Sequence, residues 1–298
     1  MKNKKYIVVG ALLAIIFLIF LFRPSGNKLY PADLVTHGHG LAVDVADSSK
    51  LYIATHHGLM TLINDKELYR IGKSKDDYMG FSVHPTNPKM FFSSGHPSTG
   101  GNLGFQYSKD GGFTWKKISK GINGPVDFHA MALSPANPDI VYGWYQDSLQ
   151  RSLDNGKTWG LIPTNLLELS KGSGVYSLVA DPKDENKVYA ATGLGLFVSN
   201  DKGASWYLAS KELEDVAIIS LAINPQDLLT MLSFTPKFGL AKSINSGLTW
   251  EKINEGFDGD LVLYIAYDKN NPNSIYILTK KNAIYKSLDA GNGWSKLI

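Results

Sequence analysis

Short, mostly apolar runs separated by polar turns recur along the chain beyond residue 40. Apolar runs of about four to eight residues bounded by turn residues are typical of buried strands. One such run recurs as three mostly apolar residues followed by a polar one, and a second apolar run follows each copy. The six copies are Leu41–Asp44, Phe81–His84, Met131–Ser134, Leu178–Asp181, Leu221–Asn224 and Ile265–Asp268. The pattern predicts an all-β fold, a six-bladed β-propeller with four-stranded antiparallel blades.

An octapeptide of the general form Ser-x-Asp-x-Gly-x-Thr-Trp occurs five times, with starts 44, 47, 44 and 44 residues apart. It predicts a tight turn between the third and fourth strands of a blade. The third residue accepts hydrogen bonds from the turn, the glycine takes a conformation that other residues disfavour, and the tryptophan packs on the turn. One carboxylate per turn is too few for Ca²⁺, so we interpret these residues as structural. They are Asp110, Asp154, Asp201, Asn245 and Asp289.

The two ends of the repeat differ from the rest. The first blade lacks the octapeptide, and Ile63–Lys66 is expected to make the corresponding turn. The last blade has its own fourth strand after Trp294. The ring is therefore expected to close by packing of the first blade on the last, and not by a shared blade.

Residues 1–27 are expected to form a separate segment. Three lysines precede the apolar run Tyr6–Phe22, whose 17 residues would span roughly 25 Å as a helix. The positive flank predicts a cytoplasmic N-terminus. We therefore expect a single-pass anchor in the cell membrane with the propeller, residues 28–298, outside. A cleaved signal peptide, which would leave the propeller secreted, is the alternative.

Composition removes several classes of function. The chain has no cysteine, which excludes disulfides, a thiolate metal site and a cysteine nucleophile. Its net charge is only +3 and its basic residues are scattered, so no nucleic-acid partner is expected.

The histidines are unevenly distributed. All seven lie between positions 37 and 129, in the first three predicted blades. Two of them precede an innermost strand by two residues, and others follow a second strand. Because strands alternate in direction within a blade, both places lie at the same end of the central channel. The residues expected to converge there are His39, His57, His96, His129, Met79 and Asp127.

Imidazole nitrogens with a thioether suit Cu or Zn, and Met79 favours copper. The same groups would also bind an anionic or sugar ligand, or act as acid and base. A purely structural role, in which the histidines cap strand ends, is the remaining interpretation. The function expected from this is a membrane-anchored binding module whose histidine-rich face takes a metal, a small ligand, a glycan or a protein partner.

The octapeptides resemble the Asp box, or BNR repeat, of sialidases, sortilin-type receptors and photosystem-assembly propellers. Four short segments are similar to those of bacterial exported single-propeller proteins with a glycosyl-hydrolase-like or sortilin-like label. They are His37–Leu41, Thr55–Leu59, Ser94–Pro97 and Asp127–Ala130. This resemblance implies the fold and the export, and it implies hydrolase activity only by analogy.

A glycoside hydrolase acting on extracellular glycans is the alternative function. Sialidases use three arginines to hold a carboxylate, but the three arginines of this chain, Arg23, Arg70 and Arg151, are not placed to do so. A two-carboxylate mechanism stays open. Acids that precede innermost strands would face the same end of the channel, although no spacing singles out a pair. They are Asp127, Glu168, Asp215, Asp258 and Asp260.

Overall fold

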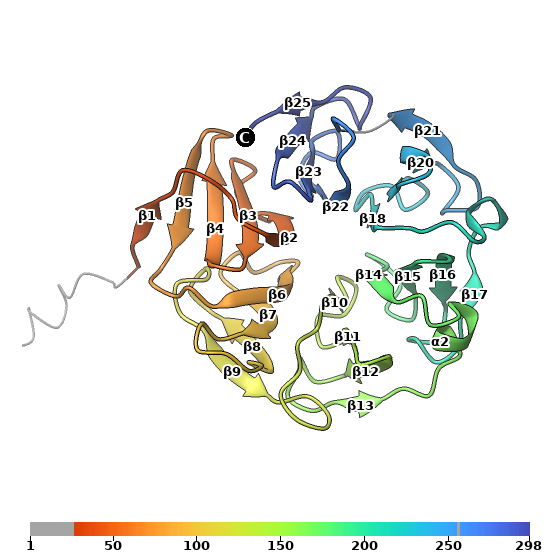
Figure 1. Cartoon of the computed structure of the whole chain (residues 1–298), viewed down its shortest axis with the longest axis horizontal. Helices are drawn as coiled ribbons and strands as arrows, with labels where there is room; N and C mark the ends of the chain where they lie inside the picture. Colours follow the sequence, from red (N-terminus) through yellow and green to blue (C-terminus); the bar gives the residue numbers. More distant parts are fainter. Residues whose placement is uncertain (1–26, 255–256) are drawn as a thin grey trace, which may run out of the picture.

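The chain folds into six antiparallel sheets that surround a central channel like the blades of a propeller (Figure 1). A computed structural model describes residues 27–254 and 257–298. Five sheets have four strands, and the sheet of the first blade carries a fifth. The predicted six-bladed, all-β architecture is confirmed. The predicted N-terminal anchor falls almost wholly outside the described residues, and within them no helix is long and apolar enough to cross a membrane.

Each blade runs outward from the channel in chain order. The first three blades comprise β2 (Gly38–Val43), β3 (Lys50–Thr55), β4 (Gly58–Ile63) and β5 (Glu67–Ile71), with β1 (Leu29–Pro31) paired outside β5; then β6 (Asp77–Val83), β7 (Phe91–His96), β8 (Phe105–Ser108) and β9 (Lys116–Ser119); then β10 (Ala130–Leu133), β11 (Val141–Tyr145), β12 (Ser148–Ser152) and β13 (Gly160–Leu161).

The remaining blades repeat this order. They comprise β14 (Val175–Ala180), β15 (Val188–Thr192), β16 (Gly195–Ser199) and β17 (Tyr207–Leu208); then β18 (Ser220–Ile223), β19 (Met231–Thr235), β20 (Gly239–Ser243) and β21 (Glu251–Asn254); then β22 (Val262–Tyr267), β23 (Ile275–Thr279), β24 (Ile284–Ser287) and β25 (Ser295–Lys296). Two short helices, α2 (Leu166–Leu169) and η1 (Lys211–Leu213), connect blades.

The second strands explain the continuous apolar runs in the sequence. Every residue of β15, β19 and β23 is buried, because each blade is covered on both faces by its neighbours. A strand covered on both faces does not alternate between apolar and polar residues. The apolar clusters accordingly join neighbouring blades: Phe92 and Phe105 of the second blade pack with Phe128 and Val141 of the third.

The five repeated turns share one hydrogen-bond pattern. In the first of them, Asp110 Oδ1 accepts bonds from the Ser108 hydroxyl at 2.8 Å and the Thr114 N–H at 2.9 Å. The Trp115 indole N–H donates to the carbonyl of Gly112 at 3.0 Å. Asn245 Oδ1 accepts the same two bonds, from the hydroxyl of its serine at 2.9 Å and the N–H of its threonine at 3.0 Å, while its Nδ2 donates to the threonine hydroxyl at 2.8 Å. The amide oxygen is thus a sufficient acceptor for the turn.

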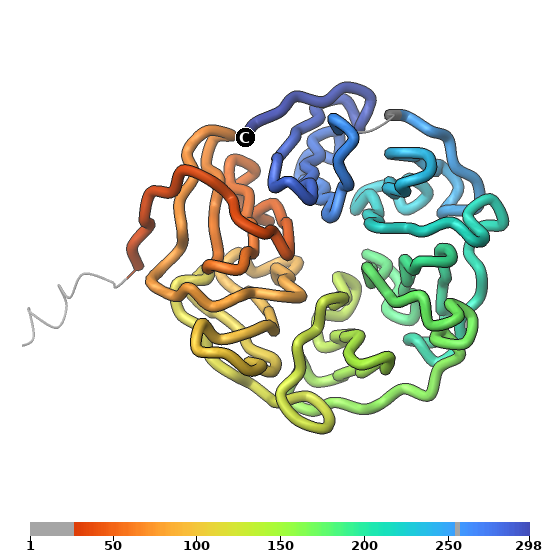
Figure 2. Tube along the Cα trace, in the orientation of Figure 1, coloured from red at the N-terminus to blue at the C-terminus, as the bar shows by residue number. Residues whose placement is uncertain are grey.

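The ring closes between the first and last blades, which lie side by side in Figure 2. The last blade has its own fourth strand, β25, as expected, so no strand is shared. In the turn Ile63–Lys66, Asp65 accepts a bond from Tyr276 at 3.0 Å and pairs with Lys286 at 2.7 Å. The first blade therefore uses the acid of its simplified turn to hold the last blade.

Replacing Asp154 tests the role of the repeated turn. Asp154→Ala removes the acceptor for the Ser152 hydroxyl and for the N–H and hydroxyl of Thr158. We expect the free energy of unfolding, measured by urea denaturation at pH 7, to fall by about 1–2 kcal/mol. Asp154→Asn is the matched control and should lose much less, because Asn245 fills the same position in another blade. Equal losses for both variants would contradict this account.

The same variants give a pH dependence. Burial raises the pKa of Asp154, but the hydrogen bonds from Thr158 and Ser152 outweigh it and lower the pKa to about 2. A carboxylate with a lowered pKa stabilises the fold above its unfolded pKa, and this contribution is lost as the pH falls through the folded value. The difference in unfolding free energy between wild type and Asp154→Ala should therefore shrink between pH 4 and about pH 2.

Candidate functional site

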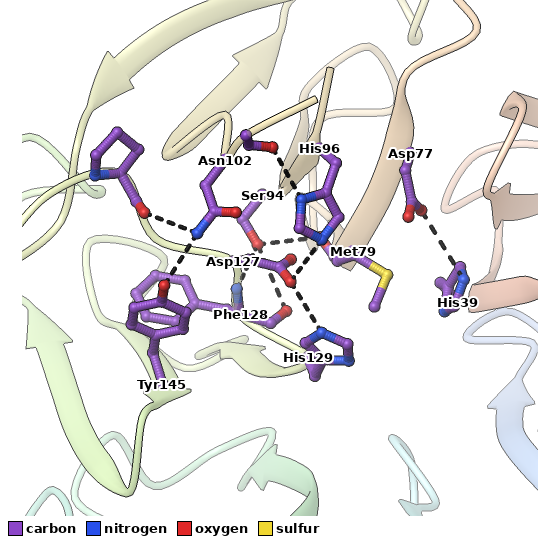
Figure 3. Close-up of polar contacts among 12 residues, drawn as sticks. His39, Asp77, Met79, Ser94, His96, Asn102, Asp127, Phe128, His129 and Tyr145 are labelled. Carbon is purple, nitrogen blue, oxygen red and sulfur yellow. Dashed lines mark hydrogen bonds and ion pairs between the residues drawn. The ribbon is translucent and has the colours of Figure 1, made fainter. Parts of the chain in front are cut away.

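Four histidines and two aspartates of the first three blades lie around one end of the channel. They belong to the start of β2, the turn after β3, the start of β6 and the paired end of β7, and the segment before β10. They form two groups whose ligand atoms lie within 4.8 Å of one another. We call them the Asp127 cluster (His96, Asp127, His129) and the Asp77 cluster (His39, His56, Asp77); Figure 3 draws the first in full and shows His39 beside Asp77 in the second.

In the Asp127 cluster two imidazoles approach one carboxylate oxygen. Asp127 Oδ2 lies 3.0 Å from His96 Nε2 and 2.8 Å from His129 Nε2. Asp127 is only 5% exposed, and its other oxygen, Oδ1, is buried without a hydrogen-bond partner. The second ring nitrogen of His96, Nδ1, lies 2.9 Å from the carbonyl oxygen of Gly101. Because a carbonyl only accepts, Nδ1 carries a proton and the His96 ring is fixed in orientation.

The sequence around Asp127 explains why this acid is held inside the protein. Its neighbours Val126 and Phe128 are fully buried and pack against the second blade, so the chain enters the core on both sides of the acid. The N–H of Phe128 donates to the Ser94 hydroxyl at 2.8 Å, and the carbonyl of Pro125 accepts a bond from Asn102 at 3.0 Å. The second blade thus fixes the segment that carries Asp127 and His129 (Figure 3).

In the Asp77 cluster the two carboxylate oxygens face different histidines. Asp77 Oδ2 makes a very short contact with His56 Nδ1, and Oδ1 lies 3.9 Å from His39 Nε2. Asp77 Oδ1 and His39 Nε2 are both buried and neither has a hydrogen-bond partner. Gly95 is required beside them: at its φ of +120° a Cβ would stand 2.1 Å from the carbonyl oxygen of Asp77.

Burial and mutual charge set the protonation of these groups. Burial, followed by the neighbouring imidazoles, lowers the pKa of His39 to about 4, so His39 is neutral at pH 7. Burial also raises the pKa of Asp77, and the charge of Asp127 adds to the rise while His56 opposes it. The hydrogen bond to Asp127 raises the pKa of His129. The two clusters therefore interact electrostatically across the channel end.

A cavity of about 150 Å³ lies at this end of the channel, with His39, His129, Tyr176 and Tyr264 in its lining. A larger cavity of about 430 Å³ lies at the opposite end of the innermost strands. Its lining is mostly aliphatic and proline, with Lys183 and Lys269 as its charged residues. Of the two clusters, His39 and His129 line the smaller cavity, and no cluster residue lines the larger one.

The fold brings together most of the residues that were expected to converge at one end of the channel. His39, His96, His129 and Asp127 belong to the clusters, and Met79 lies buried between them in Figure 3. His57 does not join them: it is exposed, and its neighbour His56 enters the Asp77 cluster instead. The turn after β3 directs the first histidine of the pair toward the channel.

Asp77 was missed by the sequence analysis, although a signal was present. Asp77 precedes the apolar run at Phe81 by four residues, and Asp127 precedes the run at Met131 by four. The two acids therefore occupy equivalent positions in neighbouring repeats. Comparing only the positions two residues before each apolar run finds His39, Met79 and His129. It does not reveal that Asp77 and Asp127 are equivalent.

No family model matches the chain. An oligoxyloglucan-reducing end-specific xyloglucanase of Emericella nidulans is 24% identical over 159 residues, 49% of this chain and 20% of the relative. A probable enzyme of the same name from Neosartorya fischeri is 27% identical over 187 residues, 56% of this chain and 23% of the relative. The crystal structure of the GH74 xyloglucanase from Xanthomonas campestris covers 91% of this chain at 17% identity, with a TM-score of 0.64.

This chain spans about a fifth of the length of these curated relatives, and 47% of the Xanthomonas campestris enzyme. The likeness to the solved structure shows the propeller fold. The expectation of a binding module is wrong, because the curated relatives are xyloglucanases and favour the glycoside hydrolase-like alternative. They do not confirm the resemblance to Asp-box and sortilin-like proteins.

Ser94 tests how the Asp127 segment is held. Ser94→Ala leaves the buried N–H of Phe128 without an acceptor, so we expect the free energy of unfolding to fall by about 1–3 kcal/mol in urea denaturation. The imidazole NMR signals of His96 and His129 should shift, because the segment that carries Asp127 is no longer held by the Ser94 hydroxyl. Ser98→Ala, an exposed serine of the same blade, is the control. Unchanged imidazole signals in Ser94→Ala would argue against the role of this bond.

Proposed function

We propose that this chain is a glycoside hydrolase-like propeller that cleaves glycosidic bonds of extracellular glycans at the histidine-lined end of its channel. One observation carries the proposal: two buried acids, Asp77 and Asp127, stand at equivalent positions of adjacent blades and face the same channel end. Glycoside hydrolysis commonly depends on two carboxyl groups that flank the scissile bond. The curated relatives, which are xyloglucanases, support this chemistry over others.

The surroundings of the two acids support the same function. Each carboxyl is more than nine-tenths buried, and each has an oxygen without a hydrogen-bond partner. The more exposed histidines, His56, His96 and His129, lie between the acids and solvent, where they would contact sugar hydroxyls. Tyr176, which lines the same cavity and is 49% exposed, offers a ring face for a sugar.

The relatives' names suggest oligosaccharides of the xyloglucan type as the first substrates to examine. The cavity of about 150 Å³ has room for one end of a chain but not for a long polysaccharide segment. We therefore expect the substrate to enter the channel end with a terminal sugar, while the rest of the glycan lies on the rim.

The hydrolysis is tested by incubating the full-length chain with xyloglucan oligosaccharides and other β-glucan oligosaccharides and measuring new reducing ends. Asp127→Asn keeps the size of the side chain and removes its charge, so we expect the rate to fall at least about 100-fold. Asp215→Asn is the matched control. Asp215 also precedes an innermost strand, β18, but its side chain is 69% exposed and pairs with Lys171, outside both clusters.

Two outcomes would overturn the proposal. One is the absence of released reducing ends from every glycan with a folded wild-type chain. The other is an Asp127→Asn rate equal to that of wild type and Asp215→Asn, which would place any hydrolysis elsewhere.

We also propose that residues 1–27 anchor the propeller at the outer face of the cell membrane, with a secreted propeller as the outcome if this segment is cleaved. The support is the apolar run Tyr6–Phe22 and its positive flank. Protease added to intact cells should digest the propeller, and detergent should be needed to release it from membranes. A protein protected from protease in intact cells would contradict this location.

A further inference from the structure

The geometry of the Asp127 cluster is close to that of a metal site. A tetrahedral ion with ligands at about 2.1 Å has ligand atoms about 3.4 Å apart. Asp127 Oδ2 lies 3.0 Å from His96 Nε2 and 2.8 Å from His129 Nε2. The three ligand atoms converge from two blades and all lie within 4.8 Å of one another, close enough to surround one ion after small side-chain shifts.

The tautomer of His96 adds an independent argument. Its Nδ1 donates to the carbonyl of Gly101, so the neutral ring presents a lone pair at Nε2. That lone pair faces a carboxylate oxygen, which also carries lone pairs. Two acceptors at 3.0 Å need a cation between them, either an added proton or a metal ion. A hydrogen bond from the far nitrogen of an imidazole to a backbone carbonyl is the arrangement that orients metal-binding histidines.

The Asp77 cluster repeats the same set of donors in the neighbouring blade. It also consists of one buried carboxylate and two imidazoles. His39 Nε2 and Asp77 Oδ1 are buried, lack hydrogen-bond partners and face each other at 3.9 Å. Together with Asp127 Oδ1, three buried polar atoms without partners therefore gather at this end of the channel. Buried polar atoms of this kind are rare unless a water or an ion satisfies them.

We propose that the Asp127 cluster and the Asp77 cluster each bind one divalent transition-metal ion, with a coordination position left open toward the channel cavity. Two imidazoles and one carboxylate suit Zn²⁺, whose catalytic sites have three protein ligands and one open position. His39 and His129 line the cavity of about 150 Å³, so each site has a ligand that faces it. The exposed side chains of the Asp127 cluster, His96 at 40% and His129 at 69%, give an ion a path from solvent.

The inference extends the proposed function to the same residues, because a metal-bound water is a nucleophile at neutral pH. In that case Asp77 and Asp127 act as metal ligands during hydrolysis and not as two carboxyl groups that flank the scissile bond, and a chelator should abolish the reaction. Metal binding itself is measured without a glycan. Binding can therefore hold when hydrolysis fails, and hydrolysis that resists the chelator would leave the proposed function in place without the ions.

The experiment uses the untagged full-length chain, stripped with a chelator, dialysed against Zn²⁺ and analysed by mass spectrometry for metal content. We expect two Zn²⁺ per chain in wild type and one in each double variant, His96→Ala/His129→Ala and His39→Ala/His56→Ala. Circular dichroism should confirm that the variants remain folded. Co²⁺ in place of Zn²⁺ should give the visible absorption of a four- or five-coordinate site, which the variants should lose in part.

The matched control is His57→Ala/His84→Ala, which removes two histidines outside both clusters and should keep two Zn²⁺. A wild type that binds no Zn²⁺ or Co²⁺ overturns the inference. Binding that is unchanged in both cluster variants, or lost in the control, also overturns it, because the ions would then be held elsewhere. One ion per chain, removed by one cluster variant only, upholds that cluster as a site and overturns the other.

Discussion

Every blade of this propeller depends on its two neighbours, because both of its faces are apolar. Strands such as β19 and β23 are buried along their whole length only while a blade lies on each side. The ring must therefore close, and the contact between the first and last blades decides whether it does. That contact is mostly apolar, with Ile53 of the first blade and Tyr276 and Leu278 of the last in one cluster. Asp65, paired with Lys286 and Tyr276, adds the polar contact at the outer part of the same seam.

The closed ring explains why polar chemistry gathers at the channel. The blade faces have no room for a charged group without a partner, and the outer turns are occupied by their own hydrogen bonds. The starts of the innermost strands are different: they lie beside a cavity, and β2 and β6 each have a register shift there. His39 lies at the shift in β2, and Asp77 and Met79 precede the shift in β6.

The sequence predicts the fold well because the fold is repetitive. Six copies of one apolar run and five copies of one octapeptide define the blades, and each copy repeats the same physical requirement. The sequence also predicts most of the residues at the histidine-lined end of the channel. The position of a residue relative to the apolar run of its innermost strand places it at one end of the channel or the other. Asp77 escapes this reasoning because only positions two residues before each run were compared, and His56 escapes because local backbone geometry decides its direction. The choice between His56 and His57 depends on the turn after β3, which the strand pattern leaves open.

The function is harder to predict from sequence because the same residues fit a binding face and a reactive site. What separates these interpretations is burial, which the pattern of residue types does not report. An aspartate in a loop before a strand is normally solvated, yet Asp127 is 5% exposed because Val126 and Phe128 pack into the core on either side of it. Burying that carboxylate removes its hydration, which is unfavourable. The surrounding contacts compensate only in part, because Oδ1 has no hydrogen-bond partner. The second blade adds support through Ser94 and Asn102 to keep the segment in place. Asp77, at the equivalent position of the neighbouring blade, is 6% exposed, so two adjacent blades each hold a buried carboxylate at this end of the channel.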